Sequence, residues 1–180
     1  MAQKILATEK EIERTLRRLA HEILERHRGG GDLLLVGIRT GGVPLARRLQ
    51  RLFQEIEGVK VPVGTLDISL YRDDWSRISF HPEVRATEIP VSLDDLEVLL
   101  VDDVIYTGRT VRAALDALMD FGRPRRVELA VLVDRGHREL PIEPNYAGFR
   151  VETRPEEHVN VLLKEIDGRD AVILETPSSS

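Results

Sequence analysis

Short, uniformly apolar runs alternate with amphipathic segments along most of this 180-residue chain. Three runs rich in leucine or valine lie at 33–36, 98–101 and 127–133, and Glu128 is the one charged residue within them. Between them, apolar residues recur at helical spacing from about 43 to 57 and from about 110 to 121. Strands without polar alternation are typical of a parallel sheet that is buried on both faces. The alternation of strands and helices therefore predicts an α/β protein with a doubly wound parallel sheet.

The first helix is predicted by its own start and stop signals. Thr8-Glu9-Lys10-Glu11 has the pattern of a capping box, in which the Thr and Glu side chains each accept a hydrogen bond from the other's backbone N–H. Glycines at 29–31 would end the helix. Its buried stripe is expected to contain Ile12, Leu16, Leu19 and Ile23.

The rest of the chain is expected to complete one domain that spans residues 1–180. Further strands are expected at 61–71, 159–163 and 171–174. The polar, proline-punctuated segment at about 72–90 has no sustained period, so it is either a functional lid or an idle hairpin. The segment at about 130–161 is expected to form a small hood over the carboxyl edge of the sheet, and residues 177–180 a disordered tail.

Composition narrows the class of protein. The chain is 42% hydrophobic and 32% charged, which is typical of a globular protein. It contains no cysteine, which excludes disulfides, thiolate zinc sites and cysteine nucleophiles. No apolar run approaches the roughly 20 residues of a membrane span, and no apolar signal region follows the amino terminus. We therefore expect a cytoplasmic protein with no membrane partner.

Because the net charge is −5, any nucleic-acid binding must come from a local basic patch.

The candidate site is centred on two adjacent acids, Asp102 and Asp103, at the end of the second apolar run. Open α/β sheets bind their ligands at the carboxyl ends of the strands. Thr107-Gly108-Arg109-Thr110 follows and leads into a helix, whose first N–H groups can bind a phosphate together with two hydroxyls and an arginine. An acidic pair beside such a loop suits a sugar phosphate, because carboxylates can hold ribose hydroxyls directly or through a divalent metal. The alternative is a solvated acidic pair before an ordinary capped helix.

A second candidate loop, Gly37-Ile38-Arg39-Thr40-Gly41-Gly42, connects the first apolar run to the following helix. A glycine-rich turn in this position can present backbone N–H groups to an anion. Many strand-to-helix turns are glycine-rich, however, so this loop indicates a function only in combination with the first.

Three motifs together point to a family. The run from Val98 to Thr110 resembles the ribose-phosphate signature of the type I phosphoribosyltransferases, in which two acids precede Thr-Gly-x-Thr. With Leu70–Asp74 and Val131–Pro141, it resembles the pyrimidine operon regulatory protein family. That resemblance implies a type I phosphoribosyltransferase fold with a small hood and a flexible flap. It also implies two activities. One converts uracil and 5-phosphoribosyl diphosphate to UMP and diphosphate. The other is RNA binding that responds to UMP or UTP and regulates pyrimidine biosynthesis genes.

The resemblance assigns roles to residues of this chain. Asp102 and Asp103 would hold the ribose hydroxyls, and Mg²⁺ would arrive near them with the diphosphate substrate. Tyr71 and Arg72, in the flap, would join Asp102, Asp103 and Arg39 as catalytic residues. The substrate-binding set would be Arg39, Thr40, Gly41, Gly42, Asp102, Asp103, Val104, Ile105, Tyr106, Thr107, Gly108, Arg109, Thr110, Asp134, Arg135 and Val159. Of these, Arg39 and Thr40 would face the pyrophosphate, the residues at 107–110 the 5′-phosphate, and the last three the base.

Gly41 departs from the family pattern. Relatives often carry an arginine at this position, in Thr-Arg-Gly, and this chain has glycine. The loop therefore has one cation fewer for pyrophosphate, for which Arg39 could compensate.

The resemblance also implies a basic RNA-binding surface. Its members would be Arg17, Arg18, His21, His137, Arg138, Arg150 and Arg154. Such residues can contact the phosphates and loop bases of a hairpin in pyrimidine operon mRNA. The alternative is that the same side chains form ion pairs with nearby glutamates on a solvated face. The family further implies a homodimer or homotetramer.

Two rival functions stay open. A purine-salvage phosphoribosyltransferase without RNA binding would share the acids and the phosphate loop, although the motif at 131–141 argues against it. A sugar-phosphate-binding protein with no catalytic activity would need neither the second loop nor a flap.

Overall fold

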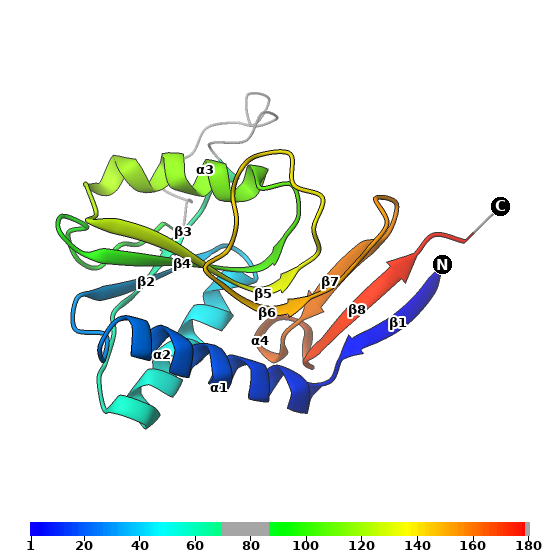
Figure 1. Cartoon of the computed structure of the whole chain (residues 1–180), viewed down its shortest axis with the longest axis horizontal. Coiled ribbons are helices and arrows are strands. Elements are labelled where there is room, and N and C mark those ends of the chain that lie inside the picture. Colours follow the sequence, from blue (N-terminus) through cyan, green and yellow to red (C-terminus); the bar gives the residue numbers. More distant parts are fainter. Residues whose placement is uncertain (70–86, 179–180) are drawn as a thin grey trace.

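A computed structural model of the protein describes residues 1–69 and 87–178 (Figure 1). The strands are β1 (Ala2–Ala7), β2 (Leu33–Ile38), β3 (Val63–Leu66), β4 (Glu97–Ile105), β5 (Arg126–Asp134), β6 (Tyr146–Arg150), β7 (His158–Leu162) and β8 (Ala171–Thr176). The helices are α1 (Glu9–Arg26), α2 (Gly42–Glu57), α3 (Arg109–Leu118), which continues as a 3-10 turn at Met119–Phe121, and α4 (Lys164–Asp167). No helix in these described ranges is long and apolar enough to cross a membrane.

The core of the fold is a five-stranded parallel sheet in the order β3-β2-β4-β5-β6. Helices α1 and α2 cover one face and α3 covers the other (Figure 1). Strand β2 shows why its run is uniformly apolar. Leu33 and Leu35 pack into the core cluster beneath α1 and α2, whereas Leu34 and Val36 pack into the cluster beneath α3. The predicted doubly wound parallel sheet is therefore confirmed.

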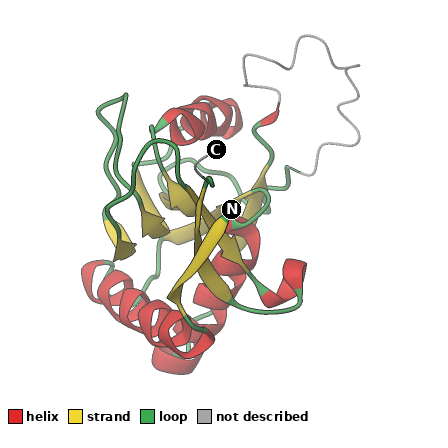
Figure 2. Cartoon of the chain, turned by 90° about the vertical axis from the view of Figure 1, so that its right-hand side faces the viewer, coloured by secondary structure: helices red, strands yellow, loops and turns green. Residues whose placement is uncertain are grey.

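A second, antiparallel sheet is built from both ends of the chain, in the order β1-β8-β7 (Figures 1 and 2). The sequence did not predict β1, because its first four residues are exposed and only the pairing with β8 defines the strand. The hood predicted at about 130–161 also differs from the observed arrangement. Residues 130–134 and 146–150 belong to the central sheet, because β6 pairs in parallel with β5.

Strand β3 is shorter than the strand predicted at 61–71. The chain turns directly after it. Asp67 N–H donates to Thr87 Oγ1 at 2.8 Å, and Ser69 N–H donates to Asp67 Oδ1 at 2.9 Å. An aspartate that accepts a hydrogen bond from the N–H two residues later stabilises a turn, and here that turn ends the strand despite its apolar pattern.

Only the end of the predicted flap at 72–90 can be placed, because residues 70–86 lie outside the described part of the chain. Within 87–90, Glu88 pairs with Thr65 of β3 in an isolated antiparallel bridge. The segment therefore returns to the edge of the central sheet before β4 begins.

Helix α1 begins and packs as predicted. Thr8 Oγ1 accepts a hydrogen bond from Glu11 N–H at 3.4 Å, and Glu11 Oε1 accepts one from Thr8 N–H at 3.2 Å. All four residues of the predicted stripe are buried. The helix ends at Arg26, before the three glycines. The capping box and the buried face are confirmed.

His27, directly after α1, connects this helix to the amino ends of β4 and β5. Its Nδ1 lies 2.5 Å from Glu97 Oε2 and its Nε2 lies 2.5 Å from Glu128 Oε1. The Tyr146 hydroxyl donates to the same Glu128 carboxylate at 3.1 Å. This buried network stabilises the edge of the sheet opposite the candidate site.

Candidate active site

The acidic pair lies inside β4, close to its carboxyl end. The sequence predicts that Asp102 and Asp103 follow the strand, but the observed strand continues to Ile105. Residues 102 and 104 still pair with β5, and this pairing, which the sequence does not show, extends the strand. The two acids therefore sit on a rigid strand instead of a free loop.

Asp102 is the more deeply buried member of the pair, with 6% of its surface exposed, whereas Asp103 is half-buried. Asp102 Oδ1 accepts a hydrogen bond from the N–H of Asp103 at 2.9 Å, and Asp103 Oδ1 accepts one from the N–H of Val104 at 2.8 Å. Burial, together with the adjacent Asp103 carboxylate, raises the pKa of Asp102 well above its ordinary value. Asp102 therefore keeps its proton to a higher pH than an exposed aspartic acid and can donate a hydrogen bond.

The glycine-rich loop between β2 and α2 lies directly against the acidic pair. A Cβ atom on Gly41 would lie 2.4 Å from Asp103 Oδ2, and one on Gly42 would lie 2.1 Å from the carbonyl oxygen of Val101. Only residues without a side chain allow so close an approach. This chain has glycine at position 41, where relatives often carry arginine. The absence of a side chain at Gly41 leaves room for Asp103.

Arg39 and Thr40 are exposed at the same edge of the sheet. The Arg39 N–H donates to the carbonyl oxygen of Leu66 at 3.0 Å, and the peptide bond between Arg39 and Thr40 is cis. Helix α2 begins two residues later, and its first N–H groups have no partner within the helix. An arginine, a hydroxyl and a helix N-terminus therefore gather beside the acids, which favours the binding of an anion.

The loop at 107–110 connects β4 to α3. Gly108 has φ +95°, a left-handed conformation that glycine adopts without strain. Helix α3 begins at Arg109, whose N–H donates to Thr107 Oγ1 at 3.3 Å. The Arg109 side chain is exposed, and its Nε donates to Glu139 Oε1 at 2.8 Å. The loop ends in a helix N-terminus, as the phosphate-binding prediction requires.

Asp134 and Arg135, which the resemblance places beside the base, are buried at the end of β5. Asp134 Oδ2 accepts a hydrogen bond from Arg138 at 2.7 Å. The Arg135 guanidinium lies 4.0 Å from the centre of the Tyr106 ring, and its Nε donates to Thr153 Oγ1 at 3.2 Å. In this structure both side chains hold neighbouring segments together, and their contact with a base stays a prediction.

The remaining predicted site residues are Val159, Tyr71 and Arg72. Val159 is in β7, half-buried against the core cluster beneath α1 and α2. Tyr71 and Arg72 lie outside the described residues. Their roles at the reacting centre stay predictions.

The predicted basic surface extends from α1 onto β6. Arg18 Nη2 donates to the carbonyl oxygen of Gly148 at 2.7 Å, and the Arg26 guanidinium lies 5.1 Å from the centre of the Tyr146 ring. Arg150 ends the same strand with 65% of its side chain exposed. A direct contact therefore connects Arg18 of the predicted basic surface to β6, the strand that carries Arg150.

The same arginines also form the ion pairs that the alternative interpretation predicts. Arg17 lies 3.3 Å from Glu55, and Arg18 lies 2.7 Å from Glu22. The side chains of all four residues are about half exposed. Ion pairs in such surroundings contribute little to stability, so an RNA phosphate can replace the carboxylate at low cost.

The other members of the predicted basic surface differ in exposure. His137 is exposed, with its Nε2 2.6 Å from the carbonyl oxygen of Thr153, and Arg154 is exposed beside it. Arg138, in contrast, has 14% of its side chain exposed and is held between loops of the candidate site. Sequence reasoning did not separate Arg138 from its neighbours, because a local pattern does not show which acceptors a guanidinium reaches. Asp134 and the Ile142 carbonyl oxygen lie four residues away in the sequence, and the Tyr106 carbonyl oxygen lies 32 residues away.

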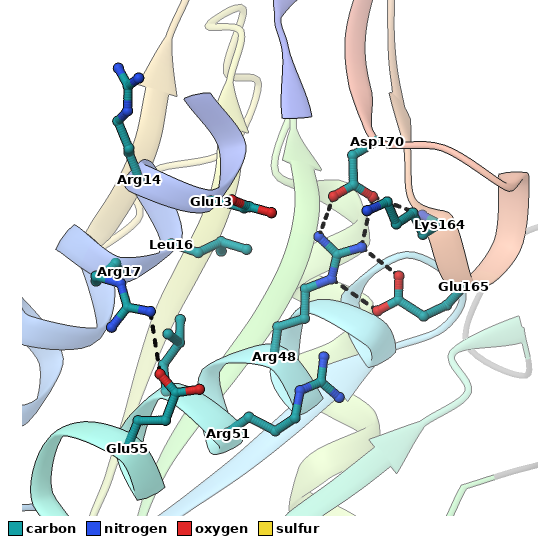
Figure 3. A pocket seen from close by; sticks show the side chains of 11 residues that line it. Glu13, Arg14, Leu16, Arg17, Arg48, Arg51, Glu55, Lys164, Glu165 and Asp170 are labelled. Atoms are coloured by element: carbon teal, nitrogen blue, oxygen red, sulfur yellow. Dashed lines mark hydrogen bonds and ion pairs between the residues drawn. The ribbon is translucent and has the colours of Figure 1, made fainter. Parts of the chain in front are cut away.

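A groove of about 510 Å³ lies between α1, α2 and α4 (Figure 3). Its wall includes Arg48, whose guanidinium donates to Asp170 at 2.8 Å and to Glu165 at 2.9 Å. Arg17 and Glu55 form the opposite wall, and none of the predicted substrate-binding residues lines the groove. The sequence did not indicate this groove, because its walls come from three separate parts of the chain.

Comparisons with known proteins agree with the fold. The model of the phosphoribosyl transferase domain family matches residues 2–173. The bifunctional protein PyrR of Pelotomaculum thermopropionicum is 61% identical over 166 residues, which cover 92% of each chain. The bifunctional protein PyrR of Halalkalibacterium halodurans is 52% identical over 178 residues, which cover 98% of this chain and 99% of the relative.

Solved structures show the same architecture. The hypoxanthine phosphoribosyltransferase of Trypanosoma cruzi superposes with a TM-score of 0.74 at 20% identity, covering 97% of each chain. A hypoxanthine phosphoribosyltransferase from Staphylococcus aureus gives a TM-score of 0.69 at 20% identity, covering 97% of this chain and 92% of that one. A likeness at this identity shows the fold alone.

Proposed function

Because this chain belongs to the phosphoribosyl transferase family and, within it, to the bifunctional PyrR proteins, we propose that it combines an enzyme and a regulator. It is a uracil phosphoribosyltransferase. It is also an RNA-binding regulator of pyrimidine biosynthesis genes that responds to uridine nucleotides. The observation that carries the enzyme activity is the contact between the glycine-rich loop and Asp103. That contact supports a pyrophosphate site and a ribose site side by side.

The proposed reaction joins uracil to the sugar. Uracil N1 forms a bond to the anomeric carbon of 5-phosphoribosyl diphosphate while the bond from that carbon to diphosphate breaks, and the N1 proton passes to water. The departure of diphosphate puts positive charge on the sugar. Arg39 and the N-terminus of α2 would neutralise the leaving group. Asp102 and Asp103 would hold the ribose hydroxyls and residues 107–110 the 5′-phosphate, which fixes the sugar at both ends.

Mg²⁺ fits this site as an ion that arrives with the diphosphate. Among the residues that the structure describes, no group of three or more His, Cys, Asp or Glu side chains could hold a metal ion alone. Mg²⁺ is usually bound through one or two carboxylates together with substrate phosphates, and Asp103 faces the pyrophosphate loop. When bound, the ion would offset the charge of the leaving diphosphate.

A panel of bases tests the enzyme activity. The protein is mixed with Mg²⁺, 5-phosphoribosyl diphosphate and uracil, hypoxanthine, guanine, xanthine or orotate in turn, and nucleotide formation is followed by chromatography. We expect UMP from uracil and no nucleotide from the other four bases. A purine nucleotide would favour the purine-salvage alternative instead, and no product with any base would leave a nucleotide sensor without catalysis.

The proposed RNA-binding surface consists of the exposed members of the predicted set, namely Arg17, Arg18, His21, His137, Arg150 and Arg154. Its partner is a hairpin in pyrimidine operon mRNA, bound through phosphates and loop bases. We also propose that the protein acts in the cytoplasm, where its proposed substrates and mRNA are found. By resemblance to the family, it would act as a homodimer or homotetramer.

Substitution of Arg18 or Arg150 by glutamine is expected to weaken binding to this hairpin and to lower the salt dependence of the affinity. Each phosphate contact that is lost should reduce the slope of log K against log salt concentration by about 1. Filter binding over a range of salt concentrations measures this slope.

Arg125→Gln is the matched control for the RNA experiment. Arg125 is half exposed and pairs with Asp32, next to the amino end of β5. Its substitution should leave hairpin affinity unchanged. An equal loss of affinity in all three variants, or equal binding to unrelated RNAs at every salt concentration, would contradict the proposed surface.

A further inference from the structure

The Arg138 side chain lies between three segments of the candidate site. Its Nη1 donates to the carbonyl oxygen of Tyr106 at 2.9 Å, its Nε donates to the carbonyl oxygen of Ile142 at 2.7 Å, and its Nη2 donates to Asp134 Oδ2 at 2.7 Å. One guanidinium therefore joins the end of β5 and the turn at residue 142 to the residue that precedes the phosphate loop. We propose that Arg138 is a positioning residue that holds this loop in the shape that binds the 5′-phosphate. The proposal rests on the proposed assignment of residues 107–110 as the phosphate site.

Backbone bonds extend this support along the phosphate loop. The N–H groups of Glu139 and Leu140 both donate to the carbonyl oxygen of Thr107, at 2.9 and 3.2 Å. The Ile142 N–H donates to the carbonyl oxygen of Leu140 at 2.8 Å, which closes the turn whose carbonyl accepts from the arginine. The segment at 139–142 thus carries one side of the phosphate loop, and the guanidinium fixes that segment to the ends of β4 and β5.

Asp134 sets the direction of the guanidinium. It is 7% exposed, and its Oδ1 accepts a hydrogen bond from Gly136 N–H at 3.0 Å. Burial alone would raise the pKa of Asp134, but hydrogen bonds from Arg138 and Gly136 hold the pKa below its ordinary value. The carboxylate therefore stays charged at neutral pH, and the arginine keeps its partner when a substrate phosphate arrives.

The exposure of Arg138 distinguishes this role from an RNA contact. Its side chain is 14% exposed, against 65% for Arg150 and 64% for Arg154. Its Nε, Nη1 and Nη2 atoms all donate within the protein, and Nη2 also reaches Glu143 at 3.1 Å. An RNA phosphate would have to replace partly buried hydrogen bonds at three nitrogen atoms here. Arg150 and Arg154 also have partners, Asp134 and Glu157, but most of each side chain is exposed.

The proposal is tested with Arg138→Gln, Arg138→Lys and the matched control Glu143→Gln. Glu143 is 68% exposed, and its substitution removes the negative charge from a contact to the same guanidinium without touching the phosphate loop. A fourth variant, Thr110→Val, removes a hydroxyl of the proposed phosphate site itself. Steady-state kinetics with both substrates, hairpin affinity and thermal unfolding are measured for all four proteins.

We expect Arg138→Gln to raise the KM for 5-phosphoribosyl diphosphate by about tenfold or more. The KM for uracil, kcat and hairpin affinity should change less than about twofold. Arg138→Lys should recover part of the loss, because its ammonium can bond Asp134 but cannot also reach both carbonyl oxygens. Glu143→Gln should behave as the unaltered protein.

Three results would overturn the proposal. If hairpin affinity falls while the KM for 5-phosphoribosyl diphosphate is unchanged, Arg138 is an RNA contact. If kcat, both KM values and thermal stability all decline together, its role is general support of the fold. If Thr110→Val raises the KM and Arg138→Gln does not, the phosphate site stands and the positioning role fails. No effect from Thr110→Val would instead reject the assignment of the phosphate site.

Discussion

Replacement of Asp103 by asparagine is expected to lower kcat/KM for UMP formation by about 100- to 1000-fold. Asp103 is half-buried on β4, and its Oδ2 lies 2.4 Å from the position that a Cβ atom on Gly41 of the glycine-rich loop would take. Asparagine keeps the shape of the side chain but removes the negative charge that the developing cation on the sugar requires. Steady-state kinetics with saturating Mg²⁺ and uracil measure the effect.

Asp116→Asn is the matched control for this experiment, because Asp116 is an exposed acid on α3. It should retain the activity of the unaltered protein. If Asp103→Asn keeps more than about a tenth of the activity, the assignment of the acidic pair to the ribose site is wrong.

For Asp102→Asn, thermal unfolding over a range of pH is measured in addition to the kinetics. Burial raises the pKa of Asp102 in the folded state, so the folded protein holds this proton more tightly than the unfolded chain. The stability of the unaltered protein should therefore decline as the pH rises from the ordinary aspartate pKa through the raised one. Asparagine has no proton to lose, so above the raised pKa the variant should unfold at a higher temperature although its activity is lost. Parallel unfolding temperatures across the pH range would contradict the raised pKa.

The second large effect is expected at Gly42. An alanine there would place its Cβ 2.1 Å from the carbonyl oxygen of Val101 and 3.1 Å from Asp102 Cα, both backbone atoms of the central strand. Backbone in the middle of a sheet cannot yield, so α2 and β4 would have to move apart. We expect the free energy of unfolding to fall by about 3 kcal/mol and UMP formation to be lost. Denaturant unfolding and kinetics measure the two effects.

Substitutions at two other glycines test whether the loss of stability comes from the clash with backbone atoms or from the added methyl group itself. Gly31→Ala is the matched control, since a Cβ there meets nothing within 4 Å. Gly41→Ala would meet the Asp103 carboxylate, a side chain that can rotate away, so this variant should lose less stability than Gly42→Ala. If Gly42→Ala is as stable as Gly31→Ala, the close approach of the loop to β4 is contradicted.

Local patterns in the sequence predicted the strands and helices of the central layers, and they also predicted where the candidate site lies along the chain. The uniform apolar run at 33–36 predicts a strand buried on both faces, and β2 indeed contributes alternate residues to the two core clusters. The capping box at Thr8 specifies the start of α1, because its two hydrogen bonds involve residues three apart. The acids at 102–103 and the loop at 107–110 form one contiguous stretch, so their proximity is visible in the sequence.

Contacts between distant segments decided the rest. β1 is mostly exposed and becomes a strand only by pairing with β8 at the other end of the chain, which no local pattern records. Asp102 and Asp103 belong to β4 because the neighbouring β5 continues its pairing past them.

At Arg138, the local sequence pattern and the tertiary structure give different answers. Its sequence neighbours His137 and Glu139 are exposed, which suits a solvated cation, yet its guanidinium is held by Tyr106, Asp134 and Ile142. Periodicity records which side of an element is buried, because that depends on the residues of the element itself. Which elements meet, and which donors find acceptors between them, depends on the packing of the whole chain, so only the tertiary structure decides it.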